Sequence, residues 1–454
     1  MIWKAIAFAT VLCAAPIMAA ALPAPDPSGD WITTVKAGAV SLRLALHLHD
    51  AGSSFDSVDQ GALGLAASMT RQGPHVVVAI EKVGAFEGEL SADGQTLTGA
   101  LKQGPANTPL VFTRGAFTAA HRPQTPVKPY PYREVDAQYD NTARAGVHLA
   151  GTLTLPNGPG PFPAVLLITG SGAQDRDETI FEHKPFLVLA DALTRRGIAV
   201  LRVDDRGTGG STGASPNDTT FDFATDAEAG VGWLKRRPDI DPRRIGLIGH
   251  SEGGVIAPMV AGKDRSVAFL VLWAGPGVRG AEVIAEQVRA LALASGAPAA
   301  AAEHARDLQA RILDAVISAP DASSGRAAAA RMMAAAGAPP PTEATLIALT
   351  SPWYRAFIAY DPAPALRALK IPVLALVGGK DTQVTAAQNI PALRAALAGD
   401  PRAEVVELPG LNHLLQPATT GGVEEYGKTE ITIDPAALKL IGDWVVAVAA
   451  ARQR

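Results

Sequence analysis

Cysteine is nearly absent from this chain of 454 residues, in which Cys13 is the only one. Leu12 directly before it is not the small residue that a lipoprotein site prefers, so no lipid anchor is expected. Cys13 also lies in an N-terminal segment that we expect to be removed, which would leave the mature protein without a thiol. Disulfides, cysteine-based metal sites and a cysteine nucleophile are therefore excluded together.

The chain also lacks concentrated positive charge. Lysine and arginine number 40 against 44 aspartate and glutamate, for a formal net charge of −4, and no block of five or more basic residues occurs. Nucleic acid is therefore not an expected partner. Hydrophobic residues make up 48% and charged residues 19% of the chain, which excludes a largely disordered protein.

The N-terminus has the pattern of an export signal, which we assign to residues 1–21. Lys4 supplies the positive charge, residues 5–17 an apolar run, and residues 19–21 small side chains suited to a signal peptidase. The apolar run is shorter than the roughly 20 residues that a membrane span needs, and Pro16 interrupts it. We expect an exported protein, periplasmic or secreted, without a stable membrane span after cleavage.

Two regions precede the main body of the chain. Residues 30–118 alternate apolar and polar side chains between turn signals, which predicts a small all-β domain, and the proline-rich residues 119–132 predict an extended linker. His47 and His49 share one face of a predicted strand beside Asp50, as paired metal ligands would. Without a third ligand at a diagnostic spacing, we interpret them as ordinary strand residues, and no metal site is predicted.

The rest of the chain predicts an α/β core over 133–275 and 365–454. Its strands are continuous apolar runs separated by helix patterns, which indicates a parallel sheet covered on both faces. Between them, residues 276–364 are rich in alanine and lack strand patterns. We interpret this stretch as a helical cap inserted into the core rather than a disordered linker. The runs that we assign to strands are 164–169, 198–203, 245–249, 269–274 and 373–377.

One glycine-rich turn has the pattern of a nucleophile elbow. Gly249-His250-Ser251-Glu252-Gly253 follows a predicted strand and precedes a predicted helix. In a G-x-S-x-G elbow the small residues relieve crowding, and the serine projects from the sheet edge. The setting therefore predicts Ser251 as a nucleophile, rather than a passive serine in a tight turn.

A serine nucleophile needs a histidine base and an acid that orients it, both downstream in this kind of fold. Only His304 and His413 follow the elbow, and His304 falls in the predicted cap. His413 follows a strand-like run and is the predicted base. Asp381 comes directly after a buried strand and is the predicted acid, with Glu407 and Asp400 as weaker candidates.

The reaction also needs two N–H donors for the oxyanion of the tetrahedral intermediate. The first is predicted to be the N–H of Glu252, directly after the serine. The second is predicted in the loop 169–177, from Ser171, or from Gly172 if the loop is shifted by one residue. This loop lacks the lysine of a P-loop and the third glycine of a dinucleotide fingerprint, so we do not interpret it as a phosphate site.

These motifs resemble those of secreted bacterial α/β-hydrolases of the EstD-like carboxylesterase group, which are akin to serine aminopeptidases and prolyl oligopeptidase-like hydrolases. The resemblance implies an α/β-hydrolase fold with a helical cap, preceded by a small all-β domain, and ester hydrolysis through an acyl-enzyme without a cofactor. Thr169 stands where many α/β-hydrolases carry histidine before the oxyanion glycine. The resemblance is carried by Gly170–Asp177, Asp204–Ser211, Gly249–Gly254, Gly379–Asp381 and Asn412-His413.

We therefore expect a serine hydrolase of small-molecule esters with short acyl groups. Trp353, Tyr354 and Phe357 in the cap would supply apolar walls for the acyl pocket. The same catalytic groups would also suit a peptidase, an amidase or an acyltransferase, and a non-catalytic protein that binds envelope material is a further alternative. No metal or cofactor is expected, and the sequence does not determine the oligomeric state.

Overall fold

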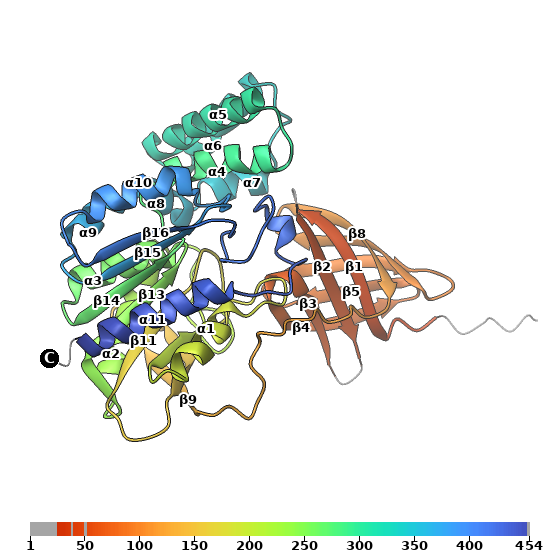
Figure 1. Ribbon diagram of the computed structural model, residues 1–454. Coiled ribbons are helices and arrows are strands. Elements are labelled where there is room, and N and C mark those ends of the chain that lie inside the picture. The colour runs from red at the N-terminus through yellow and green to blue at the C-terminus, as the bar shows by residue number, and fades with distance from the viewer. Residues whose placement is uncertain (1–24, 38–39, 50–51, 452–454) are drawn as a thin grey trace, which may run out of the picture.

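The computed structural model describes residues 25–37, 40–49 and 52–451, in two sheets with associated helices (Figure 1). The predicted export segment 1–21 and Asp50 lie outside the described residues. Within those residues, no helix combines the length and the apolar character needed to cross a membrane.

The N-terminal region forms a closed barrel in which each strand pairs with the next and β1 pairs back with β8. Buried side chains alternate with more exposed ones along β5, as expected for strands with one face in a core. Inside the barrel, Phe86 and Phe112 meet edge to face at 5.2 Å beside Trp31. The strands are β1 (Gly29–Ala37), β2 (Val40–Leu48), β3 (Ser53–Ser57), β4 (Ala62–Gln72), β5 (His75–Ile80), β6 (Gly84–Leu90), β7 (Thr96–Gln103) and β8 (Ala106–Arg114), with a 3-10 turn η1 (Val58–Gln60) before β4.

The segment that follows the barrel contains no helix or strand between residues 115 and 132. It is nevertheless attached to the C-terminal part of the chain. The side-chain oxygen of Gln124 accepts hydrogen bonds from the backbone N–H groups of Thr432 (2.6 Å) and Ile433 (3.0 Å). The segment of residues 115–132, which we name the strap, is therefore bound to the C-terminal part of the chain and is not a free linker.

The second body is built on a sheet in the order β16-β15-β14-β13-β11-β12-β10-β9. The strands from β11 to β16 run parallel, whereas β10 is antiparallel to both β12 and β9. The apolar runs that we assigned to strands are therefore parallel as predicted, and the antiparallel edge is formed by β9 and β10, which a short connection joins as a hairpin. The strands are β9 (Arg133–Asp140), β10 (His148–Leu155), β11 (Phe162–Ile168), β12 (Ala199–Val203), β13 (Ile240–His250), β14 (Val267–Trp273), β15 (Val373–Gly378) and β16 (Ala403–Leu408).

Helices cover both faces of this sheet (Figure 1). Helices α2, α3, α9 and α10 pack on one face, and α1 and α11 pack on the other. Helix α2 begins with a capping box in which Thr219 and Asp222 exchange side-chain and backbone hydrogen bonds. The helices are α1 (Pro185–Thr194), α2 (Thr220–Lys235), α3 (Gly253–Lys263), α9 (Ala363–Ala368), α10 (Ala386–Leu397) and α11 (Pro435–Ala451), with a 3-10 turn η2 (Val423–Glu425).

The helices that precede α9 between β14 and β15 form a cluster at the top of Figure 1, whereas α9 itself packs on the sheet. The side-chain caps of the clustered helices include Asp321, which accepts from the N–H of Ser324, and Ser351, which accepts from that of Tyr354. The helices share a small hydrophobic core of their own, which includes Phe357. They are α4 (Gly280–Ala294), α5 (Ala299–Ser318), α6 (Ala322–Ala335), α7 (Glu343–Leu349) and α8 (Pro352–Ala359).

Candidate active site

Ser251 lies in the turn between β13 and α3 with a φ of 53°. This left-handed conformation is uncommon for a residue with a side chain, so the surroundings must hold it in place. The backbone N–H of Ser251 donates to the carbonyl of Trp273 at 2.8 Å, which ties the turn to the end of the neighbouring strand. The predicted elbow is therefore present as a strand-turn-helix unit.

The glycines of the elbow are required by close backbone contacts. A Cβ atom on Gly249 would lie 2.0 Å from the carbonyl oxygen of Gly253. A Cβ atom on Gly253 would lie 2.2 Å from the carbonyl oxygen of Ile168, at the end of the adjacent strand. A side chain at position 249 would therefore push β13 away from the start of α3, and one at position 253 would push the elbow away from β11.

Asp381 and His413 form a buried pair at the same sheet edge. The Nδ1 atom of His413 is 2.8 Å from Oδ2 of Asp381, and the residues are 3% and 5% exposed. The other carboxylate oxygen accepts hydrogen bonds from the N–H groups of Gln383 and Val384, both at 2.8 Å. The carboxylate is thus held so that it orients the imidazole and directs Nε2 away from the pair.

The topology explains why these residues lie at one edge of the sheet. Ser251, Asp381 and His413 each follow the carboxyl end of a parallel strand, β13, β15 and β16 respectively. In a parallel sheet these ends share one edge. The two later loops also touch, because a Cβ atom on Gly378 would lie 2.3 Å from the carbonyl oxygen of Leu411.

The predicted oxyanion loop lies against the serine. A Cβ atom on Gly170 would be 3.3 Å from Cβ of Ser251. The N–H of Gly170 donates to Oε1 of Glu178 at 2.6 Å. By contrast, the N–H groups of Ser171, Gly172 and Glu252 have no acceptor within the part of the chain that the structure describes. These three predicted donors are therefore free, and their role in binding an oxyanion stays a prediction.

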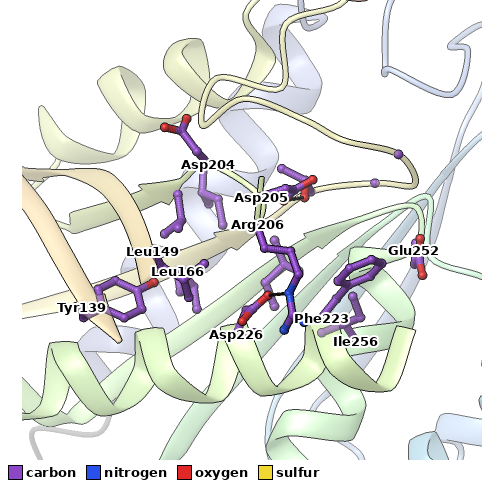
Figure 2. Close-up of a pocket in the computed structure, with 17 residues that line it drawn as sticks. Tyr139, Leu149, Leu166, Asp204, Asp205, Arg206, Phe223, Asp226, Glu252 and Ile256 are labelled. Carbon is purple, nitrogen blue, oxygen red and sulfur yellow. Dashed lines mark hydrogen bonds and ion pairs between the residues drawn. The ribbon is translucent and has the colours of Figure 1, made fainter. Parts of the chain in front are cut away.

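A cavity of about 60 Å³ opens beside this loop (Figure 2). Asp205 and Glu252 line it, and burial raises the pKa of both carboxyl groups, that of Asp205 well above its usual range. Asp205 accepts from the hydroxyl of Thr169 at 2.7 Å, and Glu252 from that of Thr220 at 2.6 Å. Among the described residues, neither carboxyl group has a lysine, arginine or histidine partner within ion-pair distance.

The neighbouring acids in the cavity are paired. Arg206 reaches Asp226 at 2.7 Å, as Figure 2 shows, and Asp218 at 2.9 Å. Arg176 binds Asp204 at 2.6 Å. The charged residues Asp204 and Arg206 of the motif 204–211 thus form ion pairs that hold the loops together. The carboxyl groups of the cavity that have no cationic partner among the described residues are those of Asp205 and Glu252.

The three aromatic residues predicted for the acyl pocket lie together on α8. The indole N–H of Trp353 donates to Oε1 of Glu252 at 2.9 Å, which links α8 to the elbow. Trp353 stacks on Phe357 at 5.8 Å, and Tyr354 packs in the same helical cluster. Burial raises the pKa of Tyr354 to about 12. None of the three lines the cavity of Figure 2, and nothing in the structure tests their contact with an acyl group.

The sequence analysis missed a second buried pair behind the serine. Nδ1 of His250 is 2.8 Å from Oε1 of Glu178, and Nε2 is 3.3 Å from the carbonyl oxygen of His413. Burial lowers the pKa of His250, but the nearby Glu178 carboxylate outweighs it, so the pKa is raised. Glu178 follows directly after the motif of residues 170–177. Its acidic side chain next to this glycine-rich loop was the only sequence signal that could have indicated the pair.

The two strand histidines outside this site have carboxylate partners. His47 lies 2.7 Å from Asp30 and 3.1 Å from Asp56, and His49 lies 3.5 Å from Asp30. Within residues 25–37, 40–49 and 52–451, no group of three or more potential ligands is arranged to hold a metal ion. His304, the rejected alternative base, is exposed on α5.

Comparisons with known proteins agree with the motifs. Esterase EstD of Thermotoga maritima is 31% identical over 271 residues, which cover 59% of this chain and 58% of the relative. An uncharacterized protein of Mycobacterium tuberculosis is 37% identical over 127 residues, covering 28% of this chain and 41% of the relative. The chain thus spans less than two thirds of the length of these relatives. The predicted resemblance to EstD-like carboxylesterases is confirmed.

Two solved structures match this chain at low identity. The α/β-hydrolase GrgF from a Penicillium species is 18% identical, with a TM-score of 0.44 over 70% of this chain and 99% of that one. The Pyrococcus furiosus esterase Pf2001 is 15% identical, with a TM-score of 0.45 over 73% and 98%. The family model of the X-Pro dipeptidyl-peptidases matches residues 145–407, more than half of the chain, and the chain therefore belongs to this family of hydrolases, the S15 family.

Proposed function

We propose that this chain is an exported serine hydrolase that cleaves carboxylic esters with short acyl groups. The observation that carries the proposal is the buried 2.8 Å contact between His413 and Asp381, at the sheet edge where Ser251 sits in a left-handed turn. A carboxylate that orients a histidine beside such a serine is the arrangement that serine hydrolases use. Export rests on the pattern of residues 1–21.

In the proposed reaction, Nε2 of His413 takes the proton of the Ser251 hydroxyl as its oxygen attacks the ester carbonyl. The N–H groups of Glu252 and of Ser171 or Gly172 stabilise the oxyanion. As the C–O bond to the alcohol breaks, His413 returns the proton to the leaving oxygen and the acyl-enzyme remains. Water then attacks with the same assistance and releases the acid, while Asp381 holds the imidazole tautomer and stabilises the imidazolium throughout.

We further propose that helices α4–α8 cap the site. The hydrogen bond between Trp353 and Glu252 supports this placement, because it joins α8 to the residue directly after the nucleophile. Aromatic side chains at this position would favour small apolar acyl groups.

A second function within the same family is supported by the two unpaired carboxyl groups of the cavity. A substrate ammonium group beside Asp205 or Glu252 would pair with a carboxylate and would lower its raised pKa. This favours substrates that carry a free amine, such as aminoacyl amides or peptides. Aminoacyl anilides and their N-acetylated counterparts distinguish the two functions, since only the free amine would gain from the acidic cavity.

The deciding experiment combines a fluorophosphonate label with a panel of p-nitrophenyl esters and aminoacyl anilides. We expect stoichiometric labelling of the wild type and of Ser295→Ala, which changes an exposed serine on the insertion, and none of Ser251→Ala. EDTA should leave the rate unchanged, because the proposed steps use only side chains and backbone N–H groups. A folded wild type that neither labels nor turns over either panel would instead support a binding protein.

A further inference from the structure

The loop of residues 175–183, which we name the Glu178 loop, connects the oxyanion loop to α1 in an unusual conformation. Glu178, Phe181 and Glu182 have φ values of 53°, 48° and 61°, although none of them is glycine. Left-handed backbone is unfavourable for such residues and persists only where the surrounding structure over-determines it. The loop has internal hydrogen bonds, such as that from the N–H of Thr179 to Asp175 at 2.9 Å, and contacts from outside the loop add to them.

The N-terminal barrel supplies polar contacts that do so. The N–H of Phe181 donates to the carbonyl of Asp59 at 2.8 Å. The guanidinium group of Arg43 on β2 lies between two carboxylates, 2.5 Å from Asp59 of the barrel and 2.7 Å from Glu182 of the loop. Asp59 is only 3% exposed, so this bridge is shielded from water on the barrel side.

The backbone of the barrel also contacts the loop directly. Gly61, at the end of η1, lies so close to the Glu178 loop that a Cβ atom on Gly61 would be 2.4 Å from the carbonyl oxygen of Thr179. Gly61 has a φ of 68°. The contact leaves no room between the barrel and the residue that follows Glu178.

At its other side the loop presents Glu178 to the site. Oε1 of Glu178 accepts from the N–H of Gly170 at 2.6 Å and contacts Nδ1 of His250 at 2.8 Å. His250 in turn contacts the carbonyl oxygen of His413 at 3.3 Å, and the indole N–H of Trp273 donates to the same oxygen at 3.2 Å. Glu178 is thus joined both to the oxyanion loop and to the loop of the proposed base.

We propose that the N-terminal barrel is a positioning element of the hydrolase site: Arg43, Asp59 and Gly61 hold the Glu178 loop in the conformation that places Glu178 between Gly170 and His250. This inference rests on the proposed function, because it assigns the barrel a part in aligning the proposed nucleophile, base and oxyanion donors. Glu178 and His250 are positioning residues in this account, since they act through the two loops that they join.

The barrel offers a matched pair of variants to test this. Gly61 and Gly64 have nearly the same φ, 68° and 66°, but a Cβ atom on Gly64 would meet nothing within 4 Å. Gly61→Ala and Gly64→Ala therefore impose similar backbone strain, and only the first pushes on Thr179. We expect Gly61→Ala to lower kcat for p-nitrophenyl acetate about tenfold with little change in KM, and Gly64→Ala to leave both constants unchanged.

A double-mutant cycle separates positioning from general destabilisation. If the barrel acts through Glu178, Gly61→Ala should lose most of its effect on kcat in a Glu178→Gln background, because coupled positions are not additive. Full additivity in the folded double variant would overturn the proposal, as would equal kcat values for Gly61→Ala and Gly64→Ala. If Gly61→Ala does not fold, we compare Arg43→Met with Arg71→Met, a substitution at an exposed position of the barrel. The same criteria then apply to this pair.

Hydrogen exchange keeps this test independent of the esterase assignment. The N–H of Gly170 is bonded to Glu178, so its exchange should accelerate in Gly61→Ala and not in Gly64→Ala. This result would support the inference even if the wild type hydrolyses no ester, in which case only the proposed function fails. Unchanged exchange in both variants would overturn the inference whatever the substrate proves to be.

Discussion

At the scale of single residues, the proposed chemistry depends on three side chains that act together. We expect Ser251→Ala, Asp381→Asn and His413→Ala each to lower kcat by about 10³-fold or more without unfolding the protein. Their effects should not add, because each alone disables the same proton transfer. Steady-state kinetics with an aryl ester and circular dichroism of each variant measure this.

The alternative acids provide the control for that series. Glu407 lies within β16, and Asp400 pairs with Arg402 at 2.6 Å, so neither should matter to turnover. Glu407→Gln and Asp400→Asn should keep nearly all of the wild-type kcat. A variant of Asp381 that keeps normal turnover, together with a loss in either control, would mean that the acid has been assigned to the wrong residue.

His250 should make stability depend on pH in a defined direction. Its two ring nitrogens face oxygen atoms of Glu178 and His413, to which a protonated imidazole can donate on both sides. Burial lowers the pKa of His250, but the attraction of Glu178 and Asp381 outweighs burial, so the pKa is raised. Since its pKa is raised on folding, the stabilisation is fully present below the unfolded pKa of about 6.5 and is lost as pH rises through the higher folded value. The difference in free energy of unfolding between wild type and His250→Gln should therefore shrink from pH 6 to pH 9.

Chemical denaturation at several pH values measures that difference. His148→Gln is a suitable control, because His148 is a more exposed histidine beside Asp140. Its difference from the wild type should be small at every pH. A His250 difference that grows toward high pH would show that the imidazole is neutral in the folded protein.

At the scale of elements, helix α8 is joined to the elbow by one hydrogen bond. Trp353→Phe removes the indole N–H that Glu252 accepts but keeps an aromatic ring stacked near Phe357. Trp353→Ala also opens space, which should shift the preference of the enzyme toward longer acyl chains. Each methylene is worth at most about 1–3 kcal/mol of discrimination.

The acyl-chain series from acetyl to octanoyl p-nitrophenyl esters measures this, with kcat/KM as the readout. Ile347→Ala, at an exposed position on α7 of the same insertion, is the control and should leave the profile unchanged. If the profile of folded Trp353→Ala matches that of the wild type, α8 does not line the acyl pocket.

At the scale of the whole molecule, the strap between the barrel and the second body should make them unfold together. The guanidinium group of Arg122 donates to backbone carbonyl oxygens of Phe181 (2.8 Å), Thr429 (2.8 Å) and Gly427 (3.1 Å). Arg122→Ala removes these three bonds to partly buried carbonyl groups. We expect a loss of about 3 kcal/mol in the free energy of unfolding, since hydrogen bonds to a charged group are among the stronger ones.

Calorimetry shows whether the strap also couples the two bodies. The wild type should give one unfolding transition, and Arg122→Ala should give two, one for the barrel and one for the α/β body. Arg71→Ala, an exposed barrel substitution, should keep a single transition. Two transitions in the wild type would mean that the strap does not couple the bodies.

Much of the candidate site was predictable because its signals are local. The elbow around Ser251 needs glycines at fixed neighbouring positions, and Asp381 and His413 each follow a strand of the parallel sheet. Such features depend on a few consecutive residues. The antiparallel edge was not predicted, because β9 and β10 lie on the chain before the continuous apolar runs and their direction depends on their partners in the sheet.

The sequence by itself determined the helices and strands of the α/β core and the polar residues that follow its strands. These are short-range properties, because they depend on the period of apolar residues, on glycines in turns and on polar residues at strand ends. Only the tertiary structure decided which distant groups meet. Glu178 and His250 are 72 positions apart, and Arg43 and Glu182 are 139 apart. Such contacts arise when sheet order and barrel docking bring separate loops together, and no local pattern encodes the distance between them. Composition and spacing thus leave several partners open for each side chain, and packing selects one of them.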